Sequence, residues 1–122
     1  MAIATVLRIT STLGVLVLLA IGVFGLLRPT AFAAQVGVRA DTPAGMGELR
    51  AVFGGFMLAM VAALTLIGSP VVYLTVGVLW LGAGVAKTIS FFLDRPAIKD
   101  GVQGIVSDAV IAALVLSGYF QS

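Results

Sequence analysis

The sequence contains no cysteine and no histidine. Without cysteine the chain cannot form a disulfide, a thiolate nucleophile or a Cys-ligated metal site. Without histidine it lacks the commonest general base and metal ligand, which excludes Ser–His and Cys–His catalysis and a haem held by imidazole. We therefore expect no catalytic residue, no metal and no cofactor, and we expect that the protein is not an enzyme.

Charged side chains are also scarce. The 122 residues include seven Lys or Arg and five Asp or Glu, whereas 61% are hydrophobic. Soluble domains carry roughly 25% charged and 45–50% apolar residues. The basic residues are scattered singly, so nucleic acid is not expected as a partner. This composition indicates an integral membrane protein that forms a single domain over residues 1–122, with the lipid bilayer as its surroundings.

Long uncharged runs locate the membrane spans. Residues 9–27 carry no charge, and residues 51–86 form an uncharged run that is too long for one span. Gly68-Ser69-Pro70 divides the longer run, because glycine and proline favour turns. A fourth apolar stretch, from about Gly101, contains Asp108 as its one charge. We predict an all-α, polytopic membrane protein with four transmembrane helices in an up-down bundle, at about 5–27, 47–67, 71–93 and 101–120.

The first span has an alternative interpretation. Arg8, the apolar run that follows it and Ala31-Phe32-Ala33 resemble a secretory signal peptide with its cleavage site. Arg28 lies between the apolar run and that site, where a charge is unusual, so we favour an uncleaved span. Pro29 can then begin a short helix that lies along the membrane interface.

Basic residues predict the orientation. The connections after the first and third spans carry Arg28, Arg39, Arg95 and Lys99, whereas the opposite face carries Arg8 alone. Short loops rich in Lys and Arg stay in the cytoplasm. We therefore predict a multi-pass protein of the bacterial inner (plasma) membrane with an N-out, C-out topology.

Four charged residues fall within the spans near the predicted cytoplasmic side: Glu48, Arg50, Lys87 and Asp108. A rise of about 1.5 Å per residue puts Lys87 about 9 Å and Asp108 about 10 Å from the nearer end of its helix. An unpaired charge at a helix centre costs about 2.5–3.5 kcal/mol, so we predict one neutral intramembrane charge cluster. The cluster either fixes the helix register through ion pairs or conducts a proton, ion or small solute.

Small residues share the faces of these charges. Ala51, Gly55, Ala59 and Ala63 recur at every fourth position of the second span. Patterns of this kind let helix backbones approach closely in lipid. We predict a helix-packing role for Ala51, Gly54, Gly55, Ala59, Gly84 and Gly104.

The segment Glu48-Leu49-Arg50-Ala51-Val52-Phe53-Gly54-Gly55 resembles the E-x-R-x-x-x-G-G motif that opens the second helix in a bacterial family of small four-span membrane proteins, catalogued as a domain of unknown function. The resemblance covers most of the chain and includes a basic residue late in the third helix and an acid in the fourth. This sequence has Lys87 and Asp108 there, where the family pattern suggests arginine and glutamate. The resemblance implies the fold and the membrane location and supplies no activity.

Three functions are weighed. An accessory, structural or assembly subunit would pack against other membrane proteins or self-associate. A small transporter or channel would use the charge cluster to move a proton, ion or small solute. A lipid-modifying enzyme is the third, and the sequence offers no nucleophile–base pair for it. We favour the accessory subunit, with the transporter or channel as the alternative.

Overall fold

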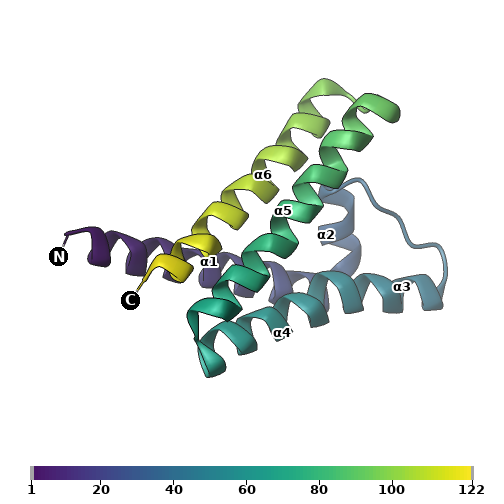
Figure 1. The fold of residues 1–122 in the computed structure, drawn as a ribbon. Coiled ribbons are helices and arrows are strands. Elements are labelled where there is room, and N and C mark those ends of the chain that lie inside the picture. The colour runs from purple at the N-terminus through teal and green to yellow at the C-terminus, as the bar shows by residue number, and fades with distance from the viewer. Residues whose placement is uncertain (1, 122) are drawn as a thin grey trace. The chain divides into compact units, whose positions relative to one another are not determined.

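The computed structural model describes residues 2–121, which form helices joined by short connections (Figure 1). Within that range the chain contains no β-strand. Four helical segments are long and apolar enough to cross a membrane: Ala2–Leu27, Pro43–Ile67, Pro70–Leu93 and Ile98–Phe120. The prediction of an all-α protein with four membrane-length helices is therefore confirmed. Their N-out, C-out orientation and their arrangement as an up-down bundle stay predictions.

Proline and glycine end the helices where the sequence places them. The first helix, α1 (Ala2–Leu27), stops two residues before Pro29, the first residue of the short helix α2 (Pro29–Gln35). Gly68 has a φ of 66°, in the left-handed region that favours glycine, and Pro70 occupies the first position of α5 (Pro70–Leu93). The expected turn at residues 68–70 and the short helix after Pro29 are both present.

Two helices begin earlier than predicted. The second membrane-length segment starts at Pro43 rather than near residue 47, because the Thr42 hydroxyl accepts a hydrogen bond from the Gly45 N–H over 3.0 Å. A threonine N-cap followed by proline is a strong start signal. The last helix, α6 (Ile98–Leu116), starts before the predicted Gly101 and continues into a 3₁₀ turn, η3 (Ser117–Phe120).

The second membrane-length segment is not a uniform α-helix. It consists of α3 (Pro43–Leu49), the π-helical turn η1 (Arg50–Gly55), α4 (Phe56–Ala62) and a second π-helical turn, η2 (Ala63–Ile67). A π turn hydrogen-bonds residue i to residue i+5, so the spacing of one face widens from four residues to five. Leu49 and Gly54, five positions apart, are accordingly both buried.

The chain divides into two compact units, one made of Met1–Gly14 with Gly68–Ser122 and the other of Val15–Ile67. The first unit contains α5, α6 and the first turns of α1. The second contains the rest of α1 and everything from α2 to η2. The prediction of a single domain over residues 1–122 stays a prediction.

In the first unit, α5 and α6 run side by side in opposite directions (Figure 1). Glycines on one helix lie against large side chains on the other, in the pairs Gly101–Phe91, Gly77–Leu116 and Gly118–Tyr73. The contacting positions of α5 follow one another at intervals of three, four or seven residues, the spacing of two helices that cross at a shallow angle. We refer to this α5–α6 contact as the seam.

The first turns of α1 join the seam through hydroxyl groups. Thr10 Oγ1 lies 2.7 Å from Ser117 Oγ, and Ser11 Oγ donates to Gln121 Oε1 over 3.2 Å. A Cβ atom on Gly14 would lie 3.1 Å from the Val115 side chain, so the helices approach closely there. Hydrogen bonds between helices in lipid contribute about 0.6 kcal/mol each on average.

In the second unit, α1 crosses the segment from Arg50 to Ala62 at glycines. A Cβ atom on Gly54 would lie 2.8 Å from Leu26 Cβ, and one on Gly22 would lie 2.8 Å from the Leu58 side chain. Gly25 lies directly against the Phe53 carbonyl, so a side chain there would displace backbone. Close backbone approach at small residues is the usual way helices associate in a bilayer.

Candidate functional site: an intramembrane ion pair

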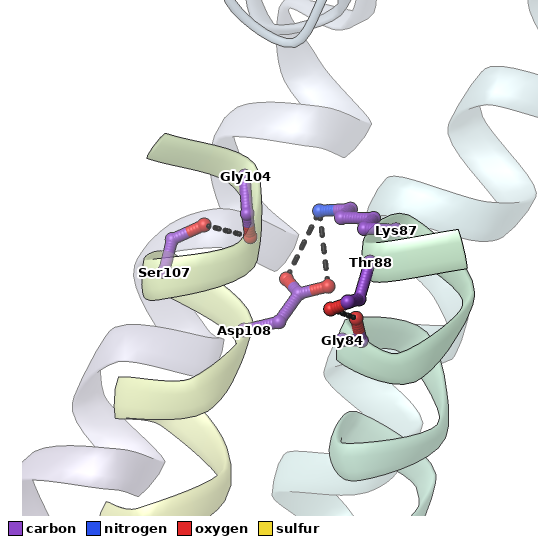
Figure 2. A network of polar contacts seen from close by, with 6 residues as sticks. All are labelled: Gly84, Lys87, Thr88, Gly104, Ser107 and Asp108. Atoms are coloured by element: carbon purple, nitrogen blue, oxygen red, sulfur yellow. Dashed lines mark hydrogen bonds and ion pairs between the residues drawn. The ribbon is translucent and has the colours of Figure 1, made fainter. Parts of the chain in front are cut away.

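Lys87 of α5 and Asp108 of α6 form an ion pair across the seam (Figure 2). The Lys87 Nζ atom lies 3.0 Å from both Asp108 carboxylate oxygens. Lys87 Nζ donates a hydrogen bond to Oδ1, whereas Oδ2 is buried and accepts no hydrogen bond from the described residues. The Asp108 side chain is 3% exposed and that of Lys87 is 48% exposed. The pair thus joins a fully buried acid to a half-exposed base.

The antiparallel direction of the two helices explains why these side chains meet. Gly84, one turn before Lys87, is level with Asp108, because a Cβ atom there would lie 3.6 Å from Asp108 Cβ. Side chains on a helix tilt toward its N-terminus. Lys87 therefore tilts toward the level of Asp108, and Asp108 tilts back toward Lys87. The two charges converge although their backbones are offset by about one turn.

Two glycines make room for the pair. Gly104 of α6 faces the Lys87 stem, and a Cβ atom there would lie 3.4 Å from Lys87 Cδ. Gly84 occupies the equivalent place beside Asp108. Both predicted packing residues, Gly84 and Gly104, thus lie at the contact between α5 and α6. A larger residue at either position would separate the helices at the ion pair.

The nearby hydroxyl groups belong to their own helices. Thr88 Oγ1 donates to the Gly84 carbonyl over 2.8 Å, and Ser107 Oγ donates to the Gly104 carbonyl over 3.0 Å (Figure 2). These intrahelical bonds satisfy each hydroxyl without contact with the carboxylate or the ammonium group. The ion pair is therefore an isolated polar contact within an apolar seam.

Asp108 lies deeper than predicted. Because α6 begins at Ile98, Asp108 is ten residues from the helix start, or about 15 Å instead of 10 Å. Lys87 is six residues from the end of α5 at Leu93, about 9 Å. A hydrocarbon core is about 30 Å thick, so a helix of this length that crosses it carries the pair within the apolar layer. The lysine reaches inward to its partner instead of extending toward the interface.

Glu48 and Arg50, the other members of the predicted cluster, belong to the second unit. Arg50 donates a hydrogen bond to the carbonyl of Leu26, in the last turn of α1. The last carbonyls of a helix lack donors within the helix and carry a partial negative charge, so an arginine there is stabilising. The Glu48 side chain forms no ion pair or hydrogen bond with the other residues of the second unit. The structure thus unites two of the four residues, and the full cluster stays a prediction.

The predicted small-residue stripe on the second helix makes no close contact at Gly55 within the second unit, and its packing role stays a prediction. Ala51, Gly55 and Ala59 are exposed, and a Cβ atom on Gly55 would meet only the Arg50 carbonyl, 4.0 Å away. Gly54 is the glycine that packs, against Leu26. The cause is the π turn η1, because its five-residue spacing moves the buried face away from the four-residue stripe.

Arg50 and Gly54 of the motif segment therefore contact the same residue, Leu26. Arg50 donates a hydrogen bond to its carbonyl, and Gly54 packs closely against it.

Sequence reasoning missed the glycines that lie against large neighbours: Gly22, Gly25, Gly77, Gly101 and Gly118. For the seam a signal was present on α5, where the contacting positions 73, 77, 84, 87 and 91 are separated by three, four or seven residues.

No three acidic side chains within residues 2–121 lie close enough together to hold a metal ion. The residues that could bind a charged ligand are the ion pair itself and the exposed basic residues of the loops. The expectations about metals, cofactors and catalysis stay predictions.

These features define the class: a small multi-pass α-helical membrane protein with an ion pair between two membrane-length helices. The family model of a domain of unknown function, DUF4345, matches residues 6–119, and the chain belongs to that family. No curated protein and no solved structure matches the chain. The suspected relationship to a family of unknown function is therefore confirmed, and it supplies no activity.

Proposed function

We propose that this protein is an accessory or structural subunit of the bacterial inner membrane, which acts by packing against membrane proteins and neither moves a solute nor catalyses a reaction. The observation that supports this best is the isolation of the Lys87–Asp108 pair. Each charge has the other as its neighbour, and both lie between two glycines in the seam.

A transport route needs a succession of polar groups along which a proton or ion can move. The hydroxyl groups on either side of the pair, on Thr88 and Ser107, are bonded to their own helix backbones. Three exposed threonines elsewhere in the membrane-length helices are hydrogen-bonded in the same way to their own helix backbones: Thr12, Thr65 and Thr75. The described side chains therefore favour a single fixed contact over a pathway.

A fixed ion pair has a clear architectural use. If α5 slid along α6 by one turn, the buried Asp108 carboxylate would lose the Lys87 ammonium and stay in an apolar seam. Removing one partner from a buried ion pair costs about 3–5 kcal/mol, so the pair strongly favours one register. The Gly101–Phe91 and Gly118–Tyr73 contacts at the two ends of the seam favour the same register.

The outer surface suits a packing role. Large apolar side chains are exposed on every membrane-length helix, among them Ile9, Phe56, Leu81 and Val110. Lipid and the apolar face of a second membrane protein can both cover such a surface. Small residues are exposed as well, at Ala51, Gly55 and Ala59, and close helix association in lipid uses residues of this size.

Purification from native membranes in a mild detergent tests the proposal. We expect the protein in a complex of defined mass and fixed stoichiometry, either with itself or with another membrane protein. Exchange into a harsher detergent should release the 12.5 kDa chain and serves as the control. A homogeneous monomer in mild detergent at native expression levels would contradict the proposal.

One observation favours the transport alternative. Asp108 Oδ2 is buried and accepts no hydrogen bond from the described residues, and an acid with a free lone pair can exchange a proton. Transport predicts flux into liposomes that is lost in Asp108→Asn while the melting temperature stays unchanged. Ser107→Ala is a matched control, because its hydroxyl is bonded to its own helix.

A further inference from the structure

The end of α1 brings two arginines of the second unit together. Arg28 directly follows Leu27, the last residue of α1, and Arg50 donates a hydrogen bond to the carbonyl of Leu26. The Arg50 guanidinium group therefore lies beside the backbone that leads into Arg28, although α2 and α3 separate the two arginines in the sequence. These residues all belong to Val15–Ile67, so their arrangement is a property of the second unit alone.

The backbone that carries the two arginines is held in place within the same unit. The Arg28 N–H donates to the Phe24 carbonyl over 2.8 Å, and the Arg28 carbonyl accepts from the Phe32 N–H over 3.0 Å. The ring centroids of Phe24 and Phe32 are 5.4 Å apart, and those of Phe32 and Phe53 are 5.0 Å apart. Phe53 belongs to the π turn that begins at Arg50. The three rings thus join the end of α1, α2 and η1 around the arginines.

Most of the hydrogen-bonding capacity of the two arginines is unused within the unit. A guanidinium group has five N–H donors, and the Leu26 carbonyl takes one from Arg50. Arg28 forms no ion pair or side-chain hydrogen bond with the residues of the second unit. Arg39, the third arginine of the unit, differs because it is paired with Asp41 over 3.2 Å. Neighbouring like charges repel, so Arg28 and Arg50 favour an anion between them.

The acids of the chain cannot neutralise every base near the end of α1, however the two units are placed. The pairs Lys87–Asp108 and Arg39–Asp41 each sum to zero. If each membrane-length helix crosses the bilayer once, the remaining charges except Arg8 lie at the membrane face where α1 ends: Arg28, Arg50, Arg95 and Lys99 against Glu48, Asp94 and Asp100. Four bases against three acids leave one cation for an anion from outside the chain.

The excess charge falls on the second unit. Asp94 and Asp100 each have a base beside them in the sequence, Arg95 and Lys99, so that loop is neutral by itself. Glu48 carries one negative charge, which cannot compensate both Arg28 and Arg50.

The position of the two arginines selects the kind of anion. Because α1 is long and apolar enough to cross a membrane, its last residue lies where the hydrocarbon layer meets the lipid headgroups. The guanidinium fork matches the oxygens of a phosphate group, and basic pockets between helices at the membrane surface bind anionic headgroups. We propose that Arg28 and Arg50 together bind the phosphate of an anionic phospholipid. This lipid site goes beyond the proposed packing function and does not depend on it.

Binding of phosphatidylglycerol, compared with zwitterionic phosphatidylcholine, tests the proposal. The full chain is titrated with each lipid in a mild detergent, while native mass spectrometry counts the bound lipids and the melting temperature is followed. We expect saturable binding of phosphatidylglycerol that raises the melting temperature, and much weaker binding of phosphatidylcholine.

Charge variants locate the site. A basic residue near the membrane surface contributes about fivefold to the affinity for anionic lipid, so Arg28→Gln should weaken phosphatidylglycerol binding about fivefold and Arg28→Gln/Arg50→Gln about 25-fold. Arg28→Gln is the decisive variant, because Arg28 forms no side-chain bond within its unit and the variant should fold normally. Arg39→Gln makes the same change of charge at an arginine that is paired with Asp41, and it should leave the affinity unchanged.

Three results would overturn the inference. The first is an equal loss of affinity in Arg39→Gln and Arg28→Gln, which would mean that the lipid responds to net charge alone. The second is displacement of the lipid by millimolar inorganic phosphate, which would make the site one for a free anion. The third is a several-fold rise in affinity in Asp94→Asn/Asp100→Asn, because the loop acids would then occupy the arginines. A monomer in mild detergent that still binds phosphatidylglycerol through Arg28 would contradict the packing function and support the lipid site.

Discussion

Removing either partner of the Lys87–Asp108 pair should destabilise the protein, and the two losses should be unequal. Lys87→Met leaves a carboxylate whose side chain is 3% exposed without its base. An uncompensated charge in such a site costs about 3–5 kcal/mol. Asp108→Asn leaves a lysine that is 48% exposed, about 9 Å from the end of its helix, and free to extend toward the interface. We expect a smaller loss there, about 1–2 kcal/mol.

The double variant Lys87→Met/Asp108→Asn should be more stable than Lys87→Met alone. It keeps one buried amide with incomplete hydrogen bonding, which costs about 1–3 kcal/mol. The double-mutant cycle should therefore give a coupling energy of about 3–4 kcal/mol, at or just above the upper end of the range for residues in direct contact. Ser107→Ala, beside the pair but bonded to its own helix, should change stability little and is the control.

The assay is unfolding of the four proteins and the control in one detergent at one pH, followed by far-UV circular dichroism. Strict additivity of the two single changes would refute the direct interaction. A larger loss for Asp108→Asn than for Lys87→Met would refute the reasoning from burial, because it would mean that the lysine is the more confined charge.

Three further predictions concern packing and topology. Gly54→Leu should destabilise the protein by about 1–3 kcal/mol, because Leu26 fills the space beside Gly54. Gly55→Leu should leave the melting temperature of the monomer nearly unchanged, and equal losses of stability in the two variants would contradict the assignment of Gly54 as the buried glycine. Gly118→Ala should lower the melting temperature because its methyl group would overlap the Tyr73 ring, and the loss should shrink in a Tyr73→Leu background; an unchanged loss would exclude this contact. A reporter that is active only in the cytoplasm should be inactive when fused after Ser122; strong activity would reverse the predicted orientation.

Hydropathy and turn residues were sufficient to predict the four helices. A span needs about 20 apolar residues, and apolar runs of that length are uncommon outside membrane-spanning helices. Gly68 and Pro70 divided the long apolar run correctly, since one supplies a positive φ and the other a helix start. The helix starts at Pro43 rather than near residue 47 because Thr42 and Pro43 form an N-cap signal that hydropathy alone does not register.

The ion pair could be predicted in part. Equal depth and small neighbours were enough to associate Lys87 with Asp108, because buried charges in lipid need partners. The same reasoning assigned Arg50 to the cluster, whereas the arginine is bonded to a backbone carbonyl of α1. Sequence contains no direct signal for such a bond, since every residue has a carbonyl and only the helix end makes this one available.

The face of the second helix could not be predicted from periodicity alone. A four-residue repeat assumes α-helical geometry, and the π turn at Arg50–Gly55 shifts the buried position from Gly55 to Gly54. One residue is about a quarter of a turn, so a single π turn is enough to bring Gly54 instead of Gly55 to the contact with Leu26 of α1.

The most direct test of the central claim, that the Lys87–Asp108 pair is architectural, is proton and ion flux into liposomes that contain the purified protein. Wild type, Asp108→Asn and Ser107→Ala are compared with empty liposomes, and the melting temperature of each protein is measured in parallel. We predict that none of the three exceeds the empty-liposome rate and that Asp108→Asn has the lowest melting temperature. Flux by wild type and Ser107→Ala that disappears in an equally stable Asp108→Asn protein would contradict the claim.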